Sequence, residues 1–334
     1  MSTPGTSRRD LLALLSGAML LAPAHAGMRH ESRYLFGSPV DLWLPQQAPS
    51  AAVTDVLRGL ETINARWNAW KPGDVTVMNQ AFRAGRSVTT TPALVSLILG
   101  AARLEQRSAG FFNAGIGGLV GAWGFHDDQL GPGRRPPAAL VEAWSKAAPS
   151  LTQLEIRGLD VRSRNPRLQL DFGGYAKGVA IDWALDHLRR CGVHDALLNL
   201  GGNLAAMGNR GARPWVVGLR DPDNEGLMAS LCTRDREAVV TSGSYERFRV
   251  LDGERVTHIF DPRTGEPAPE LVSVTVVHPS AALADAAATA LLVAGPGRWR
   301  HVAQRMGVDQ VLVVDRCGRR DATANMEMRL LPGT

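Results

Sequence analysis

The sequence has 334 residues, of which 45% are hydrophobic and 21% are charged, and its formal net charge is +5. These values are typical of a soluble globular protein with a large core. The basic residues are mostly scattered arginines without interleaved aromatic residues, so nucleic-acid binding is not indicated. The three cysteines, Cys191, Cys232 and Cys317, are widely spaced, which excludes a disulfide framework and a Cys-x-x-Cys metal site.

The N-terminal segment has the pattern of an export signal. Adjacent Arg8 and Arg9 precede a short apolar run, and Ala24-His25-Ala26 is a small-x-small cleavage pattern. The apolar run is shorter than the roughly 20 residues that a membrane anchor needs, although a retained anchor is the alternative. We therefore expect residues 1–26 to be a twin-arginine signal cleaved near Ala26, and residues 27–334 to be delivered to the bacterial periplasm.

Helices and loops are expected in the first half of the mature chain. Apolar periodicity predicts helices over 51–67 and 91–108, the second with Thr91 as N-cap and Pro92 at the first helical position. The segments 44–52 and 126–139 are rich in Pro, Gly or charge and are expected to be loops.

After Pro149 the sequence changes to short β-rich runs interrupted by two expected helices, at about 176–191 and about 280–294. Many strands with a few packed helices indicate an α+β fold, with β-sheets packed against helices in a single compact domain. The expected strands are 151–156, 167–172, 195–200, 214–219, 237–242, 246–251, 255–260, 271–277 and 310–314.

The first stretch that could carry chemistry joins an expected strand to an expected helix. The strand ends at Asp171, Gly173-Gly174 makes a tight turn, and Lys177 lies in the first turn of the helix. Free amides at a helix start attract anions, and a lysine adds charge, so the arrangement suits a phosphate. The alternative is that the two glycines form only a tight connection.

Two hard oxygen donors lie in the last expected helix. Asp285 and Thr289 are four residues apart in an Ala/Leu-rich segment, so on a helix they share one face. A carboxylate and a hydroxyl are suitable ligands for Mg²⁺, which completes its shell with carbonyls, waters and substrate phosphates. The alternative is that Asp285 interacts with the helix start while Thr289 only packs.

A histidine precedes a turn in the segment THIFDPRTGEP. On an expected strand over 256–260, His258 and Phe260 share one face, while Asp261 and Pro262 begin a turn. A neutral imidazole can act as a general base toward a hydroxyl nucleophile. A lone strand histidine can also be purely structural.

The three stretches belong to a longer series of runs, which in chain order are LDFGGYAKGVAID, LLNLGGNLAAMG, PWVVGLRDP, TSGSYERF, THIFDPRTGEP, LVSVTVV and ADAAATAL. Taken in this order, the runs resemble the ApbE family of flavin transferases. The resemblance is close over about residues 153–295 and looser over the rest of the mature chain.

The resemblance implies a T-fold-like domain and the activity of an FAD:protein FMN transferase. Such an enzyme splits the FAD diphosphate with the help of Mg²⁺, attaches FMN to a Thr or Ser of a partner flavoprotein, and releases AMP. A periplasmic address favours a membrane-associated redox protein as the partner. Two alternatives remain open: a Mg²⁺-dependent FAD pyrophosphatase and a non-catalytic FAD-binding protein.

The resemblance also implies roles for individual residues. The metal would be held by the backbone oxygen of Ala176 with Asp285 and Thr289, and His258 would lie beside the reacting phosphate. The place of Lys177 at a helix start adds it as a phosphate contact. The FAD contacts implied by similarity are Phe36, Trp70, Phe112, Asn113, Ala114, Gly173, Val179 and Ile259.

The sequence departs from the family's usual pattern mainly in its N-terminal half. The departures are FGS at residues 36–38, NAWKPGDVTVMN at 68–79 and NAGIGGL at 113–119. In addition, Ala288 stands where an acidic residue often precedes the metal-binding threonine.

Overall fold

The computed structural model describes residues 18–20, 27–222, 224–245, 247–268 and 270–332. The predicted export signal lies mostly outside these residues, apart from the short strand β1 (Ala18–Leu20), so the signal stays a prediction. No helix in these ranges has the length and apolar character needed to cross a bilayer.

The centre of the fold is an antiparallel sheet of eight strands in the order β16-β15-β14-β11-β8-β7-β3-β2. Its strands in chain order are β2 (Met28–Leu35), β3 (Ser38–Pro45), β7 (Ala196–Leu200), β8 (Asn203–Met207), β11 (Glu237–Gly243), β14 (Leu271–His278), β15 (Val311–Asp315) and β16 (Arg320–Ala322).

The inner strands are apolar on both faces because both faces of the sheet are covered. In β15, Val311 and Val313 belong to one hydrophobic cluster, whereas Leu312 and Val314 belong to another. Successive side chains of a strand point to opposite faces, so the two clusters lie on opposite sides of the sheet. A strand with a continuous apolar run, such as VLVV in β15, can therefore bury its side chains on both faces of this sheet.

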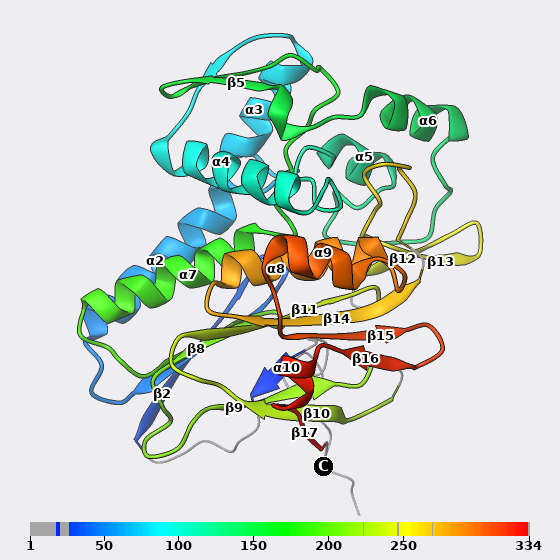
Figure 1. Ribbon diagram of the computed structural model, residues 1–334. Helices are drawn as coiled ribbons and strands as arrows, with labels where there is room; N and C mark the ends of the chain where they lie inside the picture. The colour runs from blue at the N-terminus through cyan, green and yellow to red at the C-terminus, as the bar shows by residue number, and fades with distance from the viewer. Residues whose placement is uncertain (1–17, 21–26, 223, 246, 269, 333–334) are drawn as a thin grey trace, which may run out of the picture.

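Helices cover one face, as Figure 1 shows. They are α2 (Ser50–Arg66), α7 (Ala176–Arg190), α8 (Ala281–Ala294) and α9 (Trp299–Met306). The central helix α8 is rich in alanine, and most of its residues are buried. Small side chains let α7 and the sheet approach it closely, which brings residues of α7, α8 and β11 within reach of one another.

A second, four-stranded sheet and a short helix cover the opposite face (Figure 1). The sheet has the order β1-β9-β10-β17 and includes β9 (Val216–Arg220), β10 (Leu227–Cys232) and β17 (Leu331–Pro332), and the helix is α10 (Ala324–Glu327). Trp215, which is fully buried, packs in the cluster between the sheets. This layer supports the central sheet from the side away from α8.

The remaining elements form a cap beyond the helical layer. A small core that includes Trp123, Phe125 and Phe260 joins α5 and α6 to the hairpin β12–β13. The cap elements are α3 (Asp74–Arg83), β4 (Val88–Thr89), α4 (Pro92–Arg107), α5 (Gly117–Ala122), α6 (Ala138–Ala147), the 3₁₀ turn η2 (Leu151–Gln153), β5 (Leu154–Arg157), β6 (Asp160–Ser163), β12 (Phe248–Leu251) and β13 (Glu254–Thr257).

Several predictions from the sequence are confirmed. The fold is a mixed α and β domain with sheets packed against helices, and the four predicted helices are α2, α4, α7 and α8. The side chain of Thr91 accepts a hydrogen bond from the amide of Leu94, as expected of an N-cap. Pro92 follows as the first helical residue.

The strand predicted over 167–172 is wrong. Only Gln169 makes a β-bridge, with Ile116. The backbone of the next residue, Leu170, is bonded by a side chain instead: its amide donates to Asn79 Oδ1 at 2.6 Å, and its carbonyl accepts from Asn79 Nδ2 at 2.9 Å. The amide of Asp171 donates to the carbonyl of Ala114. A buried asparagine and a loop thus replace the expected strand partner.

Other boundaries also differ. The strand predicted over 255–260 ends at Thr257, so His258 lies just beyond β13. The run 151–156 begins with the 3₁₀ turn η2, and the loop predicted over 126–139 ends where α6 begins at Ala138. The loop predicted over 44–52 is shorter, because β3 ends at Pro45 and α2 begins at Ser50.

Candidate active site

A cavity of about 570 Å³ lies where the cap meets α7, α8 and β11. This volume is in the range of small-molecule sites. Ala114 and Val179 do not line it, because Ala114 is buried in the main core and Val179 packs against that core. Among the residues singled out in the sequence, the wall includes Phe36, Trp70, Phe112, Asn113, Gly173, Ala176, Lys177, His258, Ile259, Asp285 and Thr289.

The N-terminal end of α8 is joined to the first half of α7. The carboxylate of Asp182, on α7, accepts hydrogen bonds from Ser280 Oγ at 2.8 Å and from the amides of Ala281 and Ala282 at 2.9 and 3.1 Å. A Cβ on Gly178 would lie 2.3 Å from the carbonyl oxygen of Ala281, so only glycine allows this approach. The two helices therefore hold their site residues in a fixed relation.

The carboxylate of Asp285 bridges the same two helices. It is 3% exposed, and its Oδ2 accepts a hydrogen bond from the amide of Gly178 at 3.0 Å. Burial raises the pKa of Asp285, while the charge of Lys177 and the Gly178 amide oppose that rise. The Gly178 amide at the start of α7 is thus bonded to the carboxylate of Asp285 and is not free for a phosphate. The group at this helix end that could bind a phosphate is the side chain of Lys177.

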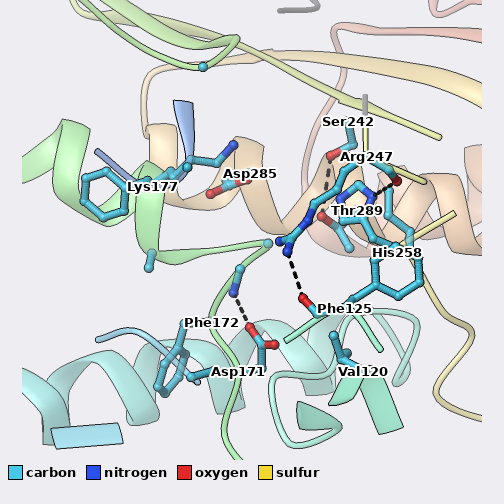
Figure 2. Close-up of a pocket in the computed structure, with 18 of the residues that line it drawn as sticks. Val120, Phe125, Asp171, Phe172, Lys177, Ser242, Arg247, His258, Asp285 and Thr289 are labelled. Carbon is cyan, nitrogen blue, oxygen red and sulfur yellow. Dashed lines mark hydrogen bonds between the residues drawn. The ribbon is translucent and has the colours of Figure 1, made fainter. Parts of the chain in front are cut away.

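Thr289 lies one turn further along α8, as predicted. Its Oγ1 is 3.5 Å from Ser242 Oγ at the end of β11. A Cβ on Gly174 would lie 2.7 Å from the same Oγ1, so the Gly173-Gly174 turn brings backbone directly against the hydroxyl. Figure 2 shows Asp285 and Thr289 on the helix that borders the cavity, with Ser242 beside Thr289.

The donor set fits a hard cation such as Mg²⁺. One carboxylate and one hydroxyl face the cavity, the Ala176 residue lines it, and a glycine leaves the space beside Thr289 free of a side chain. Magnesium is commonly bound by one or two carboxylates together with substrate phosphates and waters. In the described ranges no group of three or more His, Cys, Asp or Glu side chains is arranged so that it could hold a metal ion.

His258 lies across the cavity with a defined tautomer. Its Nδ1 is 2.8 Å from the carbonyl oxygen of Arg247, an acceptor, so Nδ1 carries the proton and Nε2 is left with a lone pair. Burial lowers the pKa of His258 to about 4, against the opposing effect of the Arg247 carbonyl, and the charges of Arg247 and Lys177 lower it further. The imidazole is therefore neutral near pH 7.

Asp261 acts as the predicted turn former. Its Oδ1 accepts a hydrogen bond from the amide of Arg263 at 2.9 Å, and its carbonyl accepts one from the amide of Gly265 at 2.8 Å. This turn returns the chain to the bridge between Phe260 and Pro267. It fixes the segment that follows His258.

Arg247 is a pocket residue that sequence reasoning missed. Its guanidinium donates to the carbonyls of Phe125 at 2.8 Å and Asp127 at 2.7 Å, and its Cζ lies 5.3 Å from the centroid of the Trp70 ring. It thus ties the loop after α5 to the segment that bears His258, as Figure 2 shows for Phe125. The motif TSGSYERF contained it, but a lone arginine there carried no distinguishing signal.

A histidine–carboxylate pair supports the edge of the cavity. His126 Nε2 lies 2.9 Å from Asp171 Oδ2, and the His126 ring stacks on Trp70 with centroids 5.4 Å apart. Burial raises the pKa of Asp171, but the hydrogen bond and charge of His126 outweigh it, so this pKa lies below its ordinary value. Asp171 Oδ1 also accepts the amide of Gly173, so the pair connects Trp70 to the glycine turn.

The N-terminal part of the chain supplies four of the cavity-lining residues expected to contact a flavin nucleotide: Phe36, Trp70, Phe112 and Asn113. Phe36 has a positive φ of 54°, and its amide donates to Asn64 Oδ1 at 2.8 Å. Both polar atoms of the Asn113 side chain are held by the protein, because Nδ2 donates to the carbonyl of Pro149 and Oδ1 accepts from the amide of Gly115. Asn113 therefore shapes this part of the wall.

Comparison with known proteins gives a consistent match. The profile of the ApbE family matches residues 36–312. A curated protein of Rhodobacter capsulatus named FAD:protein FMN transferase is 40% identical over 95% of this chain, and the match spans 61% of that protein's length. A Klebsiella pneumoniae protein of the same name is 34% identical over 84% of this chain and 88% of its own.

A solved structure agrees with the sequence comparisons. The crystal structure of the ApbE protein from Thermotoga maritima superposes with a TM-score of 0.82 at 26% identity, covering 90% of this chain and 99% of that one.

Proposed function

Since this chain belongs to the ApbE family, we propose that it is an FAD:protein FMN transferase. It would move FMN from FAD to a Ser or Thr hydroxyl of a partner protein and release AMP. The names of the relatives support flavin transfer. The observation that supports the chemistry best is that one cavity holds a neutral imidazole with a free Nε2 and the pair Asp285 and Thr289.

In the proposed reaction, His258 is the general base. The acceptor hydroxyl gives its proton to Nε2 of His258, and its oxygen forms a new bond to the phosphorus of the FMN moiety. The bond between that phosphorus and the bridging oxygen of the diphosphate breaks, and AMP leaves with the bridging oxygen. The carbonyl of Arg247 keeps the proton on Nδ1 and so fixes which nitrogen faces the substrate.

Asp285, Thr289 and the Ala176 backbone oxygen would hold Mg²⁺. When bound, the cation would neutralise charge on the diphosphate and on the leaving AMP. Lys177, in the first turn of α7, lines the same cavity and would contact a phosphate oxygen. Phe36, Trp70 and Phe112 also line the cavity, and their flat aromatic rings are suitable partners for the flavin or adenine.

The acceptor and the location are also proposals. We expect residues 1–26 to direct export and the acceptor to be a membrane-associated redox protein whose flavin domain faces the periplasm. One feature of the cavity supports a bulky second substrate such as a protein. Phe248, on the hairpin β12–β13, lines the cavity and is exposed at the surface, where an acceptor protein could contact it.

Product analysis tests the proposal. The full chain is incubated with FAD, Mg²⁺ and an acceptor domain that carries a flavinylation threonine, and protein-bound flavin, FMN and AMP are quantified. Equal amounts of AMP and protein-bound FMN support the transferase. Free FMN with AMP and no labelled acceptor indicates a pyrophosphatase, and bound, unchanged FAD indicates a binding protein.

A further inference from the structure

Asn203 is a buried residue of the cavity wall that lies in the run LLNLGGNLAAMG, but neither the sequence analysis nor the proposed mechanism gives it a role. It is the first residue of β8 and follows the Gly201-Gly202 turn. Its backbone is in register with Leu200 on β7 and Val240 on β11, so it lies in the middle of the central sheet, below α8. The residue is only 2% exposed.

The side-chain nitrogen of Asn203 has no hydrogen-bond partner among the described residues. An unsatisfied buried donor costs about 1–3 kcal/mol, so native proteins rarely keep one without a reason. Asn203 and Asp285 both line the cavity, and a side-chain interaction with Asn203 lowers the pKa of the Asp285 carboxyl. The two side chains are thus neighbours, although Asn203 Nδ2 does not reach hydrogen-bonding geometry with any acceptor in the described ranges.

One carboxylate oxygen of Asp285 can accept a further hydrogen bond. Its Oδ2 is held by the amide of Gly178, whereas in the described part of the chain no donor is bonded to Oδ1. A buried donor and a buried acceptor therefore stand side by side, each incomplete. Carboxylates that bind metals are usually themselves hydrogen-bonded, and this support fixes their orientation.

We propose that Asn203 is a positioning residue for the cation site, whose Nδ2 donates to Oδ1 of Asp285 when the site is loaded. The inference rests on the proposed function and extends it to a residue that does not touch the reacting atoms. With Gly178 on one oxygen and Asn203 on the other, the carboxylate is held at both ends. Its lone pairs then point at the cation without further rearrangement.

Ser273 provides a matched control. Its hydroxyl is also buried and without a partner among the described residues, and the residue is 1% exposed. It lies on β14 of the same sheet but does not line the cavity. Removing its hydroxyl therefore tests the loss of a buried polar group without touching Asp285.

The test measures binding of Mn²⁺ alone, by electron paramagnetic resonance, to the full-length wild type, Asn203→Leu, Asn203→Ala and Ser273→Ala. Leucine keeps the branched shape of asparagine without its polar atoms, and alanine covers the case in which the larger leucine does not pack. Thermal unfolding without metal is followed in parallel. We expect both Asn203 variants to bind Mn²⁺ about 10- to 100-fold more weakly, the range found for residues that support metal ligands. Ser273→Ala should bind like the wild type.

Three results would overturn the inference. Wild-type Mn²⁺ affinity in Asn203→Leu and Asn203→Ala would remove the positioning role and leave the proposed transferase intact. An equal loss of Mn²⁺ affinity in Ser273→Ala would show that the weaker binding comes from disturbing the central sheet and not from Asn203 itself. If the wild type itself bound no Mn²⁺, the cation step of the proposed function would fail, and Asn203 would have nothing to position.

Discussion

The Nδ1 atom of His258 lies 2.8 Å from the carbonyl oxygen of Arg247, at the edge of the cavity that also contains Asp285 and Thr289. This single contact selects the tautomer in which Nε2 is the free base. The backbone amide of His258 donates to the same carbonyl at 3.3 Å, so Arg247 holds the residue just beyond β13 by both its ring and its backbone.

Replacement of His258 by asparagine should separate the two roles of the ring. The asparagine nitrogen can still donate to the Arg247 carbonyl, but no base remains where Nε2 was. We expect the turnover number for FMN transfer to fall about 10²- to 10⁴-fold, the usual contribution of a general base. FAD binding, measured by fluorescence quenching, should stay within a few-fold. Turnover close to that of the wild type would exclude His258 as the base.

The pH dependence of transfer should reflect the lowered pKa of His258. The ordinary pKa of a histidine is 6.5, whereas that of His258 is about 4, so His258 stays neutral well below pH 6.5. The acid limb of kcat/KM, which reports groups of the free enzyme, should therefore lie far below pH 6. An acid limb near pH 6.5 that disappears in His258→Asn would show an unperturbed imidazole.

The same shift predicts a trend in stability. Between about pH 6.5 and about 4 the unfolded chain binds a proton at His258 that the folded protein does not. The contribution of neutral His258 to stability is thus complete above pH 6.5 and is lost as the pH falls toward 4. Urea unfolding at several pH values should show a smaller loss on acidification in His258→Asn than in the wild type.

Thr289 provides a test of the oxygen ligand with two conservative variants. Thr289→Val keeps the shape but loses Oγ1, whereas Thr289→Ser keeps the hydroxyl beside Gly174. We expect the valine variant to need at least about 10-fold more Mg²⁺ for half-maximal transfer, and the serine variant to stay near the wild type. Magnesium titrations that gave the same midpoint for both variants would mean that Thr289 only packs.

Gly178 should be intolerant of any side chain. A Cβ there would lie 2.3 Å from the backbone oxygen of Ala281, which cannot move aside as a flexible side chain could. We expect Gly178→Ala to lower the free energy of unfolding by about 1–3 kcal/mol or more, the cost of overpacking. Gly297→Ala is the control, since a Cβ at Gly297 meets no atom within 4 Å. Equal unfolding midpoints for the two variants in urea would contradict the close approach of α7 and α8.

The elements that were predicted correctly are those whose signals lie within the element itself, such as a helix cap or an apolar composition. Helix α4 has Thr91 as its cap and Pro92 at its start, and α8 has an apolar composition over its full length, so both were readable from sequence. The segment 167–172 alternates like a strand, yet Asn79, about 90 residues earlier in the chain, takes its hydrogen bonds. Such a long-range side-chain contact leaves no periodic trace.

The residues proposed to take part in the reaction were predictable from the sequence, whereas the residues that hold them in place were not. The four-residue spacing of Asp285 and Thr289 placed them on one helix face, and the structure brings both to the cavity with His258. Arg247 and Asn203 were not found, because their roles depend on a carbonyl contact and on a missing hydrogen bond that only the folded chain shows.

The central claim is that a deprotonated acceptor oxygen takes FMN from FAD in this cavity. Intact-mass spectrometry of an acceptor domain, after incubation with the protein, FAD and Mg²⁺, tests it most directly. The account predicts an acceptor heavier by one phosphoester-linked FMN, with Asp285→Ala and His258→Asn giving little or none. An acceptor of unchanged mass, while FAD is consumed to free FMN and AMP, would contradict it.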